Sequence, residues 1–217
     1  MKILVIAPHP DDEVLGAGGT LFRYQMMGHS TAWLIITEVP EELGWSHEKI
    51  KKREDEISHI SKLFSFEEVY NLRLPTARLD TLPFLEIVQK ISKVIETFKP
   101  DEILIPHFGD AHTDHQIVHK AALCCAKWFR HPSIIRVLVY ETISETNFGL
   151  GREGVFNPNV FIDISDFLEK KVAAMEVYSS EIGSFPFPRS KIAIESLARY
   201  RGSSAGYCAA EAFQLLC

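Results

Sequence analysis

The sequence has few cysteines, no long apolar run and no excess of positive charge, and each shortage excludes a class of protein. Four of the 217 residues are cysteine, two of them adjacent and none in a CxxC spacing, so we expect reduced core thiols in a cytoplasmic protein. The apolar runs are strand-sized, well short of the ~18 residues of a membrane-spanning helix, so no transmembrane segment is expected. The net charge of −6 excludes nucleic acid as a partner.

The remaining composition is that of one folded domain over residues 1–217. Hydrophobic residues make up 46% and charged residues 24%, and no repeat or flexible linker interrupts the chain. Short apolar runs alternate with longer amphipathic stretches, which predicts an α/β fold: a mainly parallel sheet with helices on both faces. The predicted strands are 2–8, 31–37, 67–72, 102–106, 136–140 and 159–164. The predicted helices are 18–28, 46–64, 83–98, 113–129, 166–178 and 191–201.

The end of the first predicted strand carries an unusual group of side chains. In a parallel sheet, sites form where strands end, and here residues 8–13 supply His9, which is flanked by two prolines, followed by Asp11 and Asp12. His9 and Asp12 are good zinc ligands, and Asp11 can point toward a water bound to the metal. Two adjacent carboxylates repel one another unless a cation offsets their charge. A turn followed by a helix N-cap explains the aspartates, but it does not explain His9.

A second group of candidate site residues follows the predicted strand 102–106. It holds four of the nine histidines: His107, His112, His115 and His119. One three-histidine zinc site could be made from this segment alone. We favour a split site of His9, Asp12 and His115, because it leaves an open coordination position for water. It also frees His112 and Asp114 for acid–base work, since a carboxylate beside an imidazole raises its pKa and fixes its orientation.

Arg53 is predicted to lie on the apolar face of the helix 46–64. Ile50, Ile57 and Ile60 recur at helical spacing on that face, and Arg53 falls on the same stripe. A buried guanidinium needs acceptors. Two interpretations stay open: Arg53 binds substrate or orients a site carboxylate, or it forms a structural ion pair or extends to the surface.

These residues resemble the motifs of the LmbE/PIG-L family of zinc-dependent deacetylases. The segment 8–13, completed by Leu15, Gly16, Gly18, Gly19 and Thr20, looks like its opening motif, and the segment 112–115 resembles its His-x-Asp-His motif. Residues 53–56 and 207–213 are similar to two weaker motifs, so the matches span nearly the whole chain. Asp110 stands near the place where some relatives carry a tyrosine.

The resemblance implies a Rossmann-like fold and a deacetylase that uses zinc or another divalent metal. The substrate would be a small N-acetyl amino sugar or glycoconjugate. The implied metal ligands are His9, Asp12 and His115. Asp11 would be the general base, His112 would stabilise the oxyanion or protonate the amine, and Asp114 would tune His112. Arg53, from its place on the apolar face of the helix 46–64, is our candidate substrate-binding residue. The alternatives are a metal-dependent amidase or phosphoesterase, or a non-catalytic sugar- or nucleotide-binding module. An oligomer is compatible with the sequence.

Overall fold

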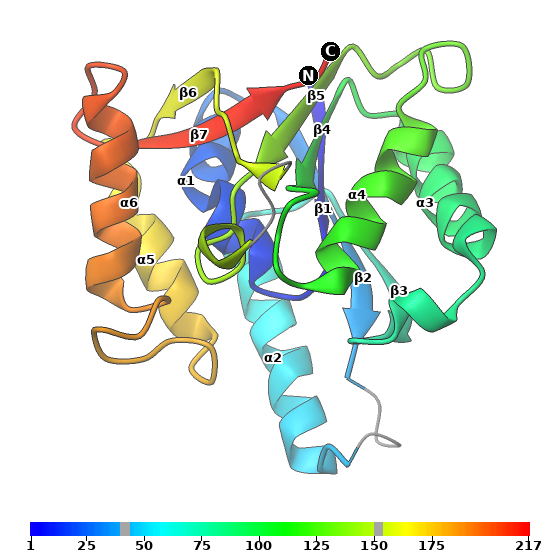
Figure 1. The fold of residues 1–217 in the computed structure, drawn as a ribbon, viewed down its shortest axis with the longest axis horizontal. Helices are drawn as coiled ribbons and strands as arrows, with labels where there is room; N and C mark the ends of the chain where they lie inside the picture. Colours follow the sequence, from blue (N-terminus) through cyan, green and yellow to red (C-terminus); the bar gives the residue numbers. More distant parts are fainter. Residues whose placement is uncertain (40–43, 150–153) are drawn as a thin grey trace.

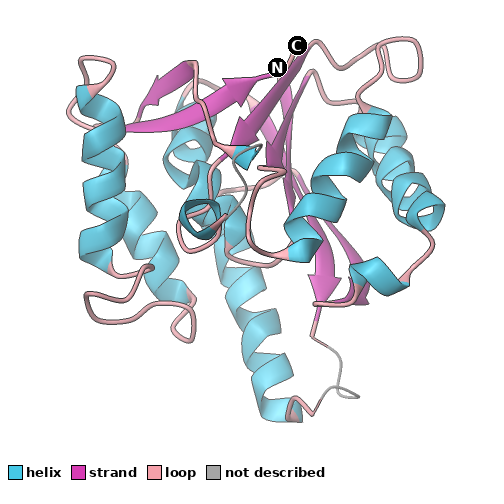
Figure 2. Ribbon diagram, viewed as in Figure 1, coloured by secondary structure: helices cyan, strands magenta, loops and turns pink. Residues whose placement is uncertain are grey.

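A seven-stranded sheet runs through the centre of the molecule in the order β3-β2-β1-β4-β5-β7-β6 (Figures 1 and 2). The structure, a computed structural model, describes residues 1–39, 44–149 and 154–217. The strands are β1 Lys2–Ala7, β2 Ser30–Glu38, β3 Glu68–Pro75, β4 Glu102–Pro106, β5 Arg136–Tyr140, β6 Val160–Asp163 and β7 Ala210–Leu215. Strands β1 to β5 are parallel, and β7 is antiparallel to both of its neighbours. The mainly parallel α/β sheet that the sequence predicts is confirmed.

Helices cover both faces of this sheet, as predicted. They are α1 Asp12–Met26, α2 His47–Leu63, α3 Phe84–Phe98, α4 Thr113–Cys125, α5 Leu168–Val177 and α6 Lys191–Ser203, with short 3-10 helices η2 Leu79–Thr81 and η3 Thr146–Phe148. Helices α3 and α4 pack on one face, and α1, α2, α5 and α6 lie on the other (Figure 1). The two faces bury separate apolar cores, because a parallel sheet is apolar on both sides.

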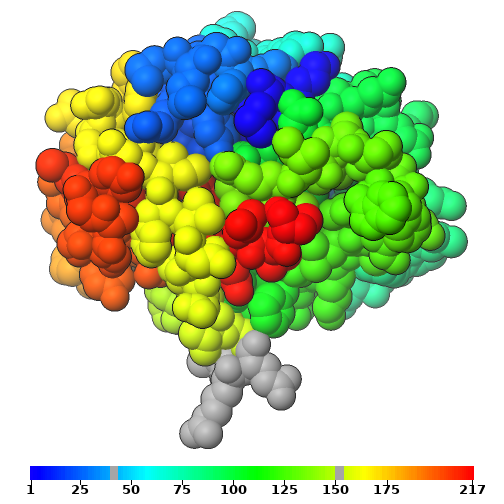
Figure 3. Space-filling model, turned by 90° about the horizontal axis from the view of Figure 1, so that it is seen from above, coloured from blue at the N-terminus to red at the C-terminus, as the bar shows by residue number. Residues whose placement is uncertain are grey.

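The two ends of the chain lie at the edge of the sheet where β1 begins. In Figure 3, which views the molecule from that side, the C-terminal residues lie at the surface between segments from the middle and the last third of the chain. The backbone N–H of Val137 donates to the Cys217 carbonyl at 2.9 Å. The loops that follow the parallel strands lie at the opposite end of the sheet, where those strands end.

The largest differences from the predicted elements concern α1 and β7. Helix α1 begins at Asp12, six residues before the predicted start, and Asp11 is its N-cap. Its glycines disfavour a helix by propensity, but they allow close packing: a Cβ on Gly16 would lie 2.2 Å from Cδ2 of Tyr140. Strand β7 was not predicted. The N-cap role of Ser46 is confirmed, since its Oγ accepts from the Lys49 N–H at 3.3 Å.

The cysteines differ in part from the prediction of core thiols. All four are free, but only Cys125 is buried and Cys124 is half-buried, whereas Cys208 and Cys217 are exposed. The expectation of a core position is therefore wrong for Cys208 and Cys217. Among the described residues, no helix combines the length and the apolar character needed to cross a membrane.

A buried ion pair anchors α1 to α5 and to β7. Lys171 Nζ lies 2.6 Å from Glu211 Oε1 and donates to the Leu15 carbonyl at 2.8 Å. The Glu211 carboxylate accepts from the N–H groups of Gly19 and Thr20 at 2.9 and 2.7 Å. Because α1 begins at Asp12, this pair also fixes the helix that presents the first group of predicted site residues.

Candidate metal and catalytic site

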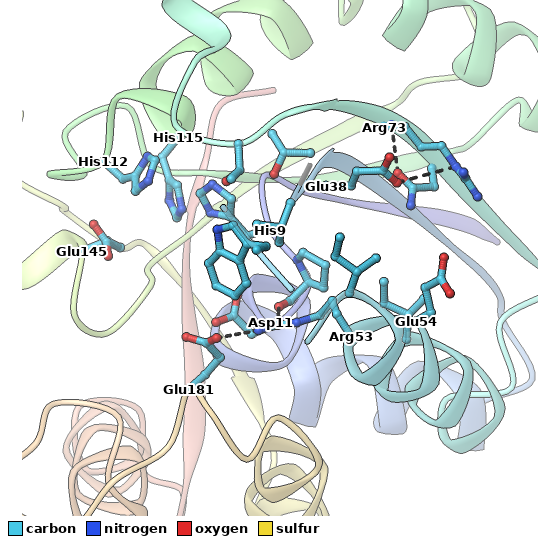
Figure 4. A pocket seen from close by; sticks show the side chains of 18 of the residues that line it. His9, Asp11, Glu38, Arg53, Glu54, Arg73, His112, His115, Glu145 and Glu181 are labelled. Atoms are coloured by element: carbon cyan, nitrogen blue, oxygen red, sulfur yellow. Dashed lines mark hydrogen bonds and ion pairs between the residues drawn. The ribbon is translucent and has the colours of Figure 1, made fainter. Parts of the chain in front are cut away.

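Two segments about one hundred residues apart meet where β1 and β4 end. These strands are neighbours in the sheet, with Val5 paired with Leu104. The chain leaves β1 into residues 8–13 and leaves β4 into residues 107–115, so both groups of predicted site residues lie at the same edge. Figure 4 shows His9, His112 and His115 close together on one side of a pocket at this edge.

His9, Asp12 and His115 form a cluster that can hold a metal ion. Their candidate ligand atoms all lie within 4.8 Å of one another. Asp12 Oδ2 is central: it lies 3.4 Å from His9 Nδ1 and 3.2 Å from His115 Nε2. The structure thus brings together the three predicted ligands.

The charges of this cluster fit a divalent cation. Burial lowers the pKa of His9, but hydrogen bonds with Asp114 and Asp12 outweigh it and raise the pKa to about 9. Burial also lowers the pKa of His115, but the charge of Asp12 and a hydrogen bond with Asp110 raise it to about 10. The carboxylates therefore stabilise positive charge at the imidazoles. Two imidazole nitrogens and one carboxylate oxygen form a donor set suited to Zn²⁺.

Asp110, which the sequence analysis did not assign to the site, orients His115. Its Oδ2 accepts from His115 Nδ1 at 2.8 Å, and its Oδ1 accepts from Thr146 Oγ1 at 2.6 Å. With Nδ1 occupied in this way, His115 directs Nε2 toward Asp12. A carboxylate that fixes the far nitrogen of a metal-binding histidine is typical of metal sites.

The carboxylate of Asp114 hydrogen-bonds to His9 rather than to His112. Its fully buried Oδ2 lies 3.1 Å from His9 Nε2 and accepts from the Ala77 N–H at 2.7 Å, and its Oδ1 accepts from the Leu79 N–H at 3.3 Å. The distance from Asp114 Oδ2 to His112 Nδ1 is 4.0 Å, too long for a hydrogen bond. We expect from the sequence that Asp114 tunes and orients His112. Its carboxylate hydrogen-bonds to His9 instead, while its charge acts to raise the pKa of His112 and its backbone N–H donates to the His112 ring.

His112 lines the pocket as a neutral imidazole. Burial lowers its pKa, and the neighbouring His9 adds to this effect, which brings the pKa to about 4. Its Nδ1 accepts from the Asp114 backbone N–H at 3.1 Å, so the ring proton is on Nε2. His112 also forms a second group of possible ligands with His9 and Asp114. The Asp114 oxygen in that group already accepts a backbone N–H, which makes the cluster around Asp12 the better metal site.

The other two histidines of this segment lie apart from the cluster. His119 Nδ1 bonds the Pro106 carbonyl at 2.8 Å, and His107 Nε2 bonds the Gly154 carbonyl at 2.7 Å. Neither belongs to a group of potential metal ligands in the described part of the chain. The alternative of a three-histidine site within this segment therefore lacks the geometry that it needs.

Asp11 is held in an uncommon conformation beside the cluster. Its φ is 138° and its ψ is −28°, a region that residues other than glycine rarely adopt. The buried Glu13 accepts the Asp11 N–H at 3.0 Å, and Arg189 Nη1 donates to Asp11 Oδ2 at 2.8 Å. Burial and the charge of Asp12 raise the pKa of Asp11 to about 7, although the charge of Arg189 opposes the shift.

Two arginines link the segment around Asp11 to α2 and to the loop before α6: Arg53 through Pro10, and Arg189 through Asp11 itself. Arg189 also contacts Glu181 at 3.1 Å. Arg53 bonds the same Glu181 and donates to the Pro10 carbonyl at 2.7 Å. Arg53 therefore lies at the pocket without pairing with a site aspartate. Arg189 and Glu181 could not be predicted from the sequence, because no motif or spacing links the loop 179–190 to the two strand ends.

The pocket is a cleft of about 500 Å³. Its described lining is His9, Pro10, Asp11, Thr37, Glu38, Val39, Trp45, Ile50, Arg53, Glu54, Ile57, Asn71, Arg73, Thr76, His112, His115, Glu145, Glu181 and Arg189. Its volume is within the range of pockets that bind small molecules. The candidate metal cluster opens into this cleft through His9 and His115.

Comparison with known proteins agrees with this geometry. Residues 4–126 match the family model for PIG-L, described as GlcNAc-PI de-N-acetylase. The diacetylchitobiose deacetylase of Thermococcus kodakarensis is 24% identical over 99% of this chain and 83% of its own. The probable N-acetyl-alpha-D-glucosaminyl L-malate deacetylase 2 of Bacillus cereus is 26% identical over 82% of this chain and 83% of its own.

A solved structure has the same fold. The conserved protein TT1542 from Thermus thermophilus superposes with a TM-score of 0.78 and 28% identity, covering 97% of this chain and 92% of that one. The matched residues 4–126 include both strand ends and all three predicted metal ligands. The chain therefore belongs to the PIG-L family and is a deacetylase.

Proposed function

We propose that this deacetylase hydrolyses the acetamido group of an N-acetyl amino sugar or glycoconjugate, with Zn²⁺ or another divalent cation held by His9, Asp12 and His115. The observation that carries the proposal is the convergence of His9 and His115 on Asp12 Oδ2, at 3.4 and 3.2 Å. The relatives named for diacetylchitobiose and for N-acetylglucosaminyl malate support an N-acetyl sugar as substrate. The size of the cleft is compatible with such a small molecule.

Asp11 is the general base of this proposal. When bound, the metal would supply Lewis acidity that polarises the acetyl carbonyl and acidifies water. Arg189 holds one oxygen of the Asp11 carboxylate at 2.8 Å, which leaves the other oxygen to accept a proton from water. The water oxygen bonds to the acetyl carbon, the C–N bond breaks, and the proton is delivered to the departing amine. A positioned base of this kind contributes roughly 10²–10⁴-fold to the rate.

His112 supplies a hydrogen-bond donor at the same end of the cleft. Because its Nδ1 accepts a backbone N–H, the neutral ring can donate only from Nε2. This donor stabilises the negative charge that develops on the acetyl oxygen, an effect of order 10²–10³-fold. Asp114 acts through His9, whose ring it holds in place.

Metal analysis combined with acetate release tests the proposal. The purified protein should contain about one equivalent of a divalent metal and release acetate from at least one N-acetyl sugar. Asp11→Asn should retain the metal and lose ~10²–10⁴-fold in kcat, whereas His115→Ala should lose both. Asp166→Asn is the matched control, because Asp166 is exposed and lies outside the cleft lining. Near-normal turnover by Asp11→Asn would exclude its role as base.

A further inference from the structure

The positive charges of the cleft are already neutralised by the protein itself. Arg53 pairs with Glu181 and Glu56, and Arg189 pairs with Asp11, Glu181 and Glu145. Arg73 forms an exposed pair with Glu38 at 3.6 Å. No lysine is among the lining residues that the structure describes, and five of these residues are acidic. An anionic group on a substrate would have to compete with a carboxylate of the protein for each guanidinium. At Arg53 and Arg189, whose pairs are mostly buried, leaving either anion without a partner is strongly unfavourable.

One wall of the cleft is apolar and aromatic. Val39 follows β2, Trp45 precedes α2, and Ile50 and Ile57 lie one above the other along α2. Trp45 is 39% exposed, although it is the largest apolar side chain that lines the cleft. Lys49 Nζ lies 5.4 Å from the centroid of the Trp45 ring and is outside the cleft lining. A partly exposed indole in a cleft is suited to stacking against a flat ring or the apolar face of a sugar.

The cleft is larger than one N-acetylhexosamine. Such a sugar has about 15 non-hydrogen atoms and fills roughly 200–250 Å³ at ordinary packing density. The cleft volume is about 500 Å³, so about half of it remains for the group attached to the sugar. Figure 4 shows the histidines on one side of the pocket and the Glu38–Arg73 pair on the other, so the space extends well away from the reacting end.

We infer that this cleft selects neutral glycoconjugates, with an uncharged apolar or aromatic group on the sugar packed against Trp45, Ile50 and Ile57. The inference rests on the proposed function, which places the acetamido group beside His9 and His115. The substrates inferred for this chain therefore differ from the anionic conjugates after which the family model and the Bacillus cereus relative are named. A phosphodiester or a malate carboxylate finds no unpaired cation among the described lining residues.

The first experiment compares substrates of different charge. The values of kcat/KM are measured for both anomers of phenyl and methyl N-acetylglucosaminide and for N-acetylglucosaminyl malate. The wild type should prefer the phenyl glycoside to the malate conjugate by at least about tenfold. Glu54→Lys should raise kcat/KM for the malate conjugate by about five- to tenfold at low salt, and the gain should shrink at high salt. Glu169→Lys, on the exposed surface of α5, should change none of these values more than twofold.

The second experiment tests the aromatic wall. Trp45→Ala should lower the ratio of kcat/KM for phenyl over methyl glycoside by about two- to tenfold, the size of an aromatic stacking contribution. Trp128→Ala is the matched control, since Trp128 is 76% exposed and lines no part of the cleft. The ratio should not change in this control. An unchanged ratio in Trp45→Ala would overturn the assignment of the wall.

The outcomes separate this inference from the proposed function. If no glycoside releases acetate, the proposed function fails. If acetate is released but the malate conjugate is preferred, the proposed function stands and the inference of neutral selectivity is overturned. If the phenyl glycoside is preferred and the charge reversal at Glu54 removes that preference, both stand.

Discussion

Replacing Gly16 by alanine should destabilise the protein, because α1 packs directly on the ring of Tyr140 in β5. A Cβ at this position would lie 2.2 Å from Cδ2 of Tyr140, 2.6 Å from Cγ and 2.8 Å from Cε2, whereas carbon atoms normally approach to about 3.5–4.0 Å. Tyr140 is fully buried, and its hydroxyl donates to the Ile6 carbonyl at 2.9 Å. The ring therefore cannot move aside without losing a buried hydrogen bond.

The expected size follows from three contributions. Overpacking a core by one methyl group costs about 1–3 kcal/mol, and straining or breaking the Tyr140 hydrogen bond adds about 1 kcal/mol. Alanine in place of glycine within a helix returns at most about 1 kcal/mol. We expect Gly16→Ala to lower the free energy of unfolding by about 2–3 kcal/mol.

Gly18→Ala in the same helix is the matched control. Its Cβ would meet Val14 Cγ1 at 3.3 Å and Lys171 Cγ at 3.4 Å, which are tight contacts but not overlaps. The free energy of unfolding of this variant should stay within about 1 kcal/mol of the wild type, because helix propensity offsets the small strain. Urea unfolding followed by circular dichroism measures both variants. Equal stability of the two variants would refute the close-packing argument.

Three further results are expected. Asp110→Asn should weaken zinc binding by about 10–100-fold, measured by competition with a chelator, because His115 loses the carboxylate that orients it; unchanged affinity would contradict that role. Glu211→Gln should lower the free energy of unfolding by about 3–5 kcal/mol, because it leaves the Lys171 charge buried without its partner, and a loss below 1 kcal/mol in urea would count against the anchor. Arg189→Met should reduce kcat by roughly 10–100-fold while metal content is unchanged, because the Asp11 carboxylate is no longer held in place. Arg189→Lys should recover part of the rate. Equal kcat in wild type and Arg189→Met would exclude this effect.

The fold was predictable because local pattern and tertiary structure agree in the central strands. Strands 102–106 and 136–140 are confirmed to the residue, since each is a short apolar run buried on both faces. Strand β7 could not be found in this way. Its sequence mixes alanine, glutamate and glutamine, and its position between β5 and β6 depends on antiparallel pairing over long separations. The early start of α1 was missed because Gly16, Gly18 and Gly19 argue against a helix by propensity, and their packing role is visible only in three dimensions.

The candidate metal ligands could be predicted from their positions in the sequence. His9, Asp12 and His115 could be joined because both segments follow strands, and strands of a parallel sheet end at one edge. The partners of these residues could not be predicted from neighbours in sequence. Asp114 lies two residues from His112 but contacts His9, because the turn at 77–79 supplies the backbone N–H groups that hold its carboxylate. Arg189 reaches Asp11 across 178 positions of the chain.

The site is divided between the portion of the chain that the family model matches and the portion beyond it. The ligand cluster and its supporting Asp110 and Asp114 lie within residues 4–126, whereas Glu145, Glu181 and Arg189 come from later segments. Changes in the later segments can therefore alter the surroundings of Asp11 and the shape of the cleft without touching a ligand. An artificial chimera that keeps residues 4–126 and exchanges the loops after β5 would keep the candidate ligand cluster while changing the lining of the cleft.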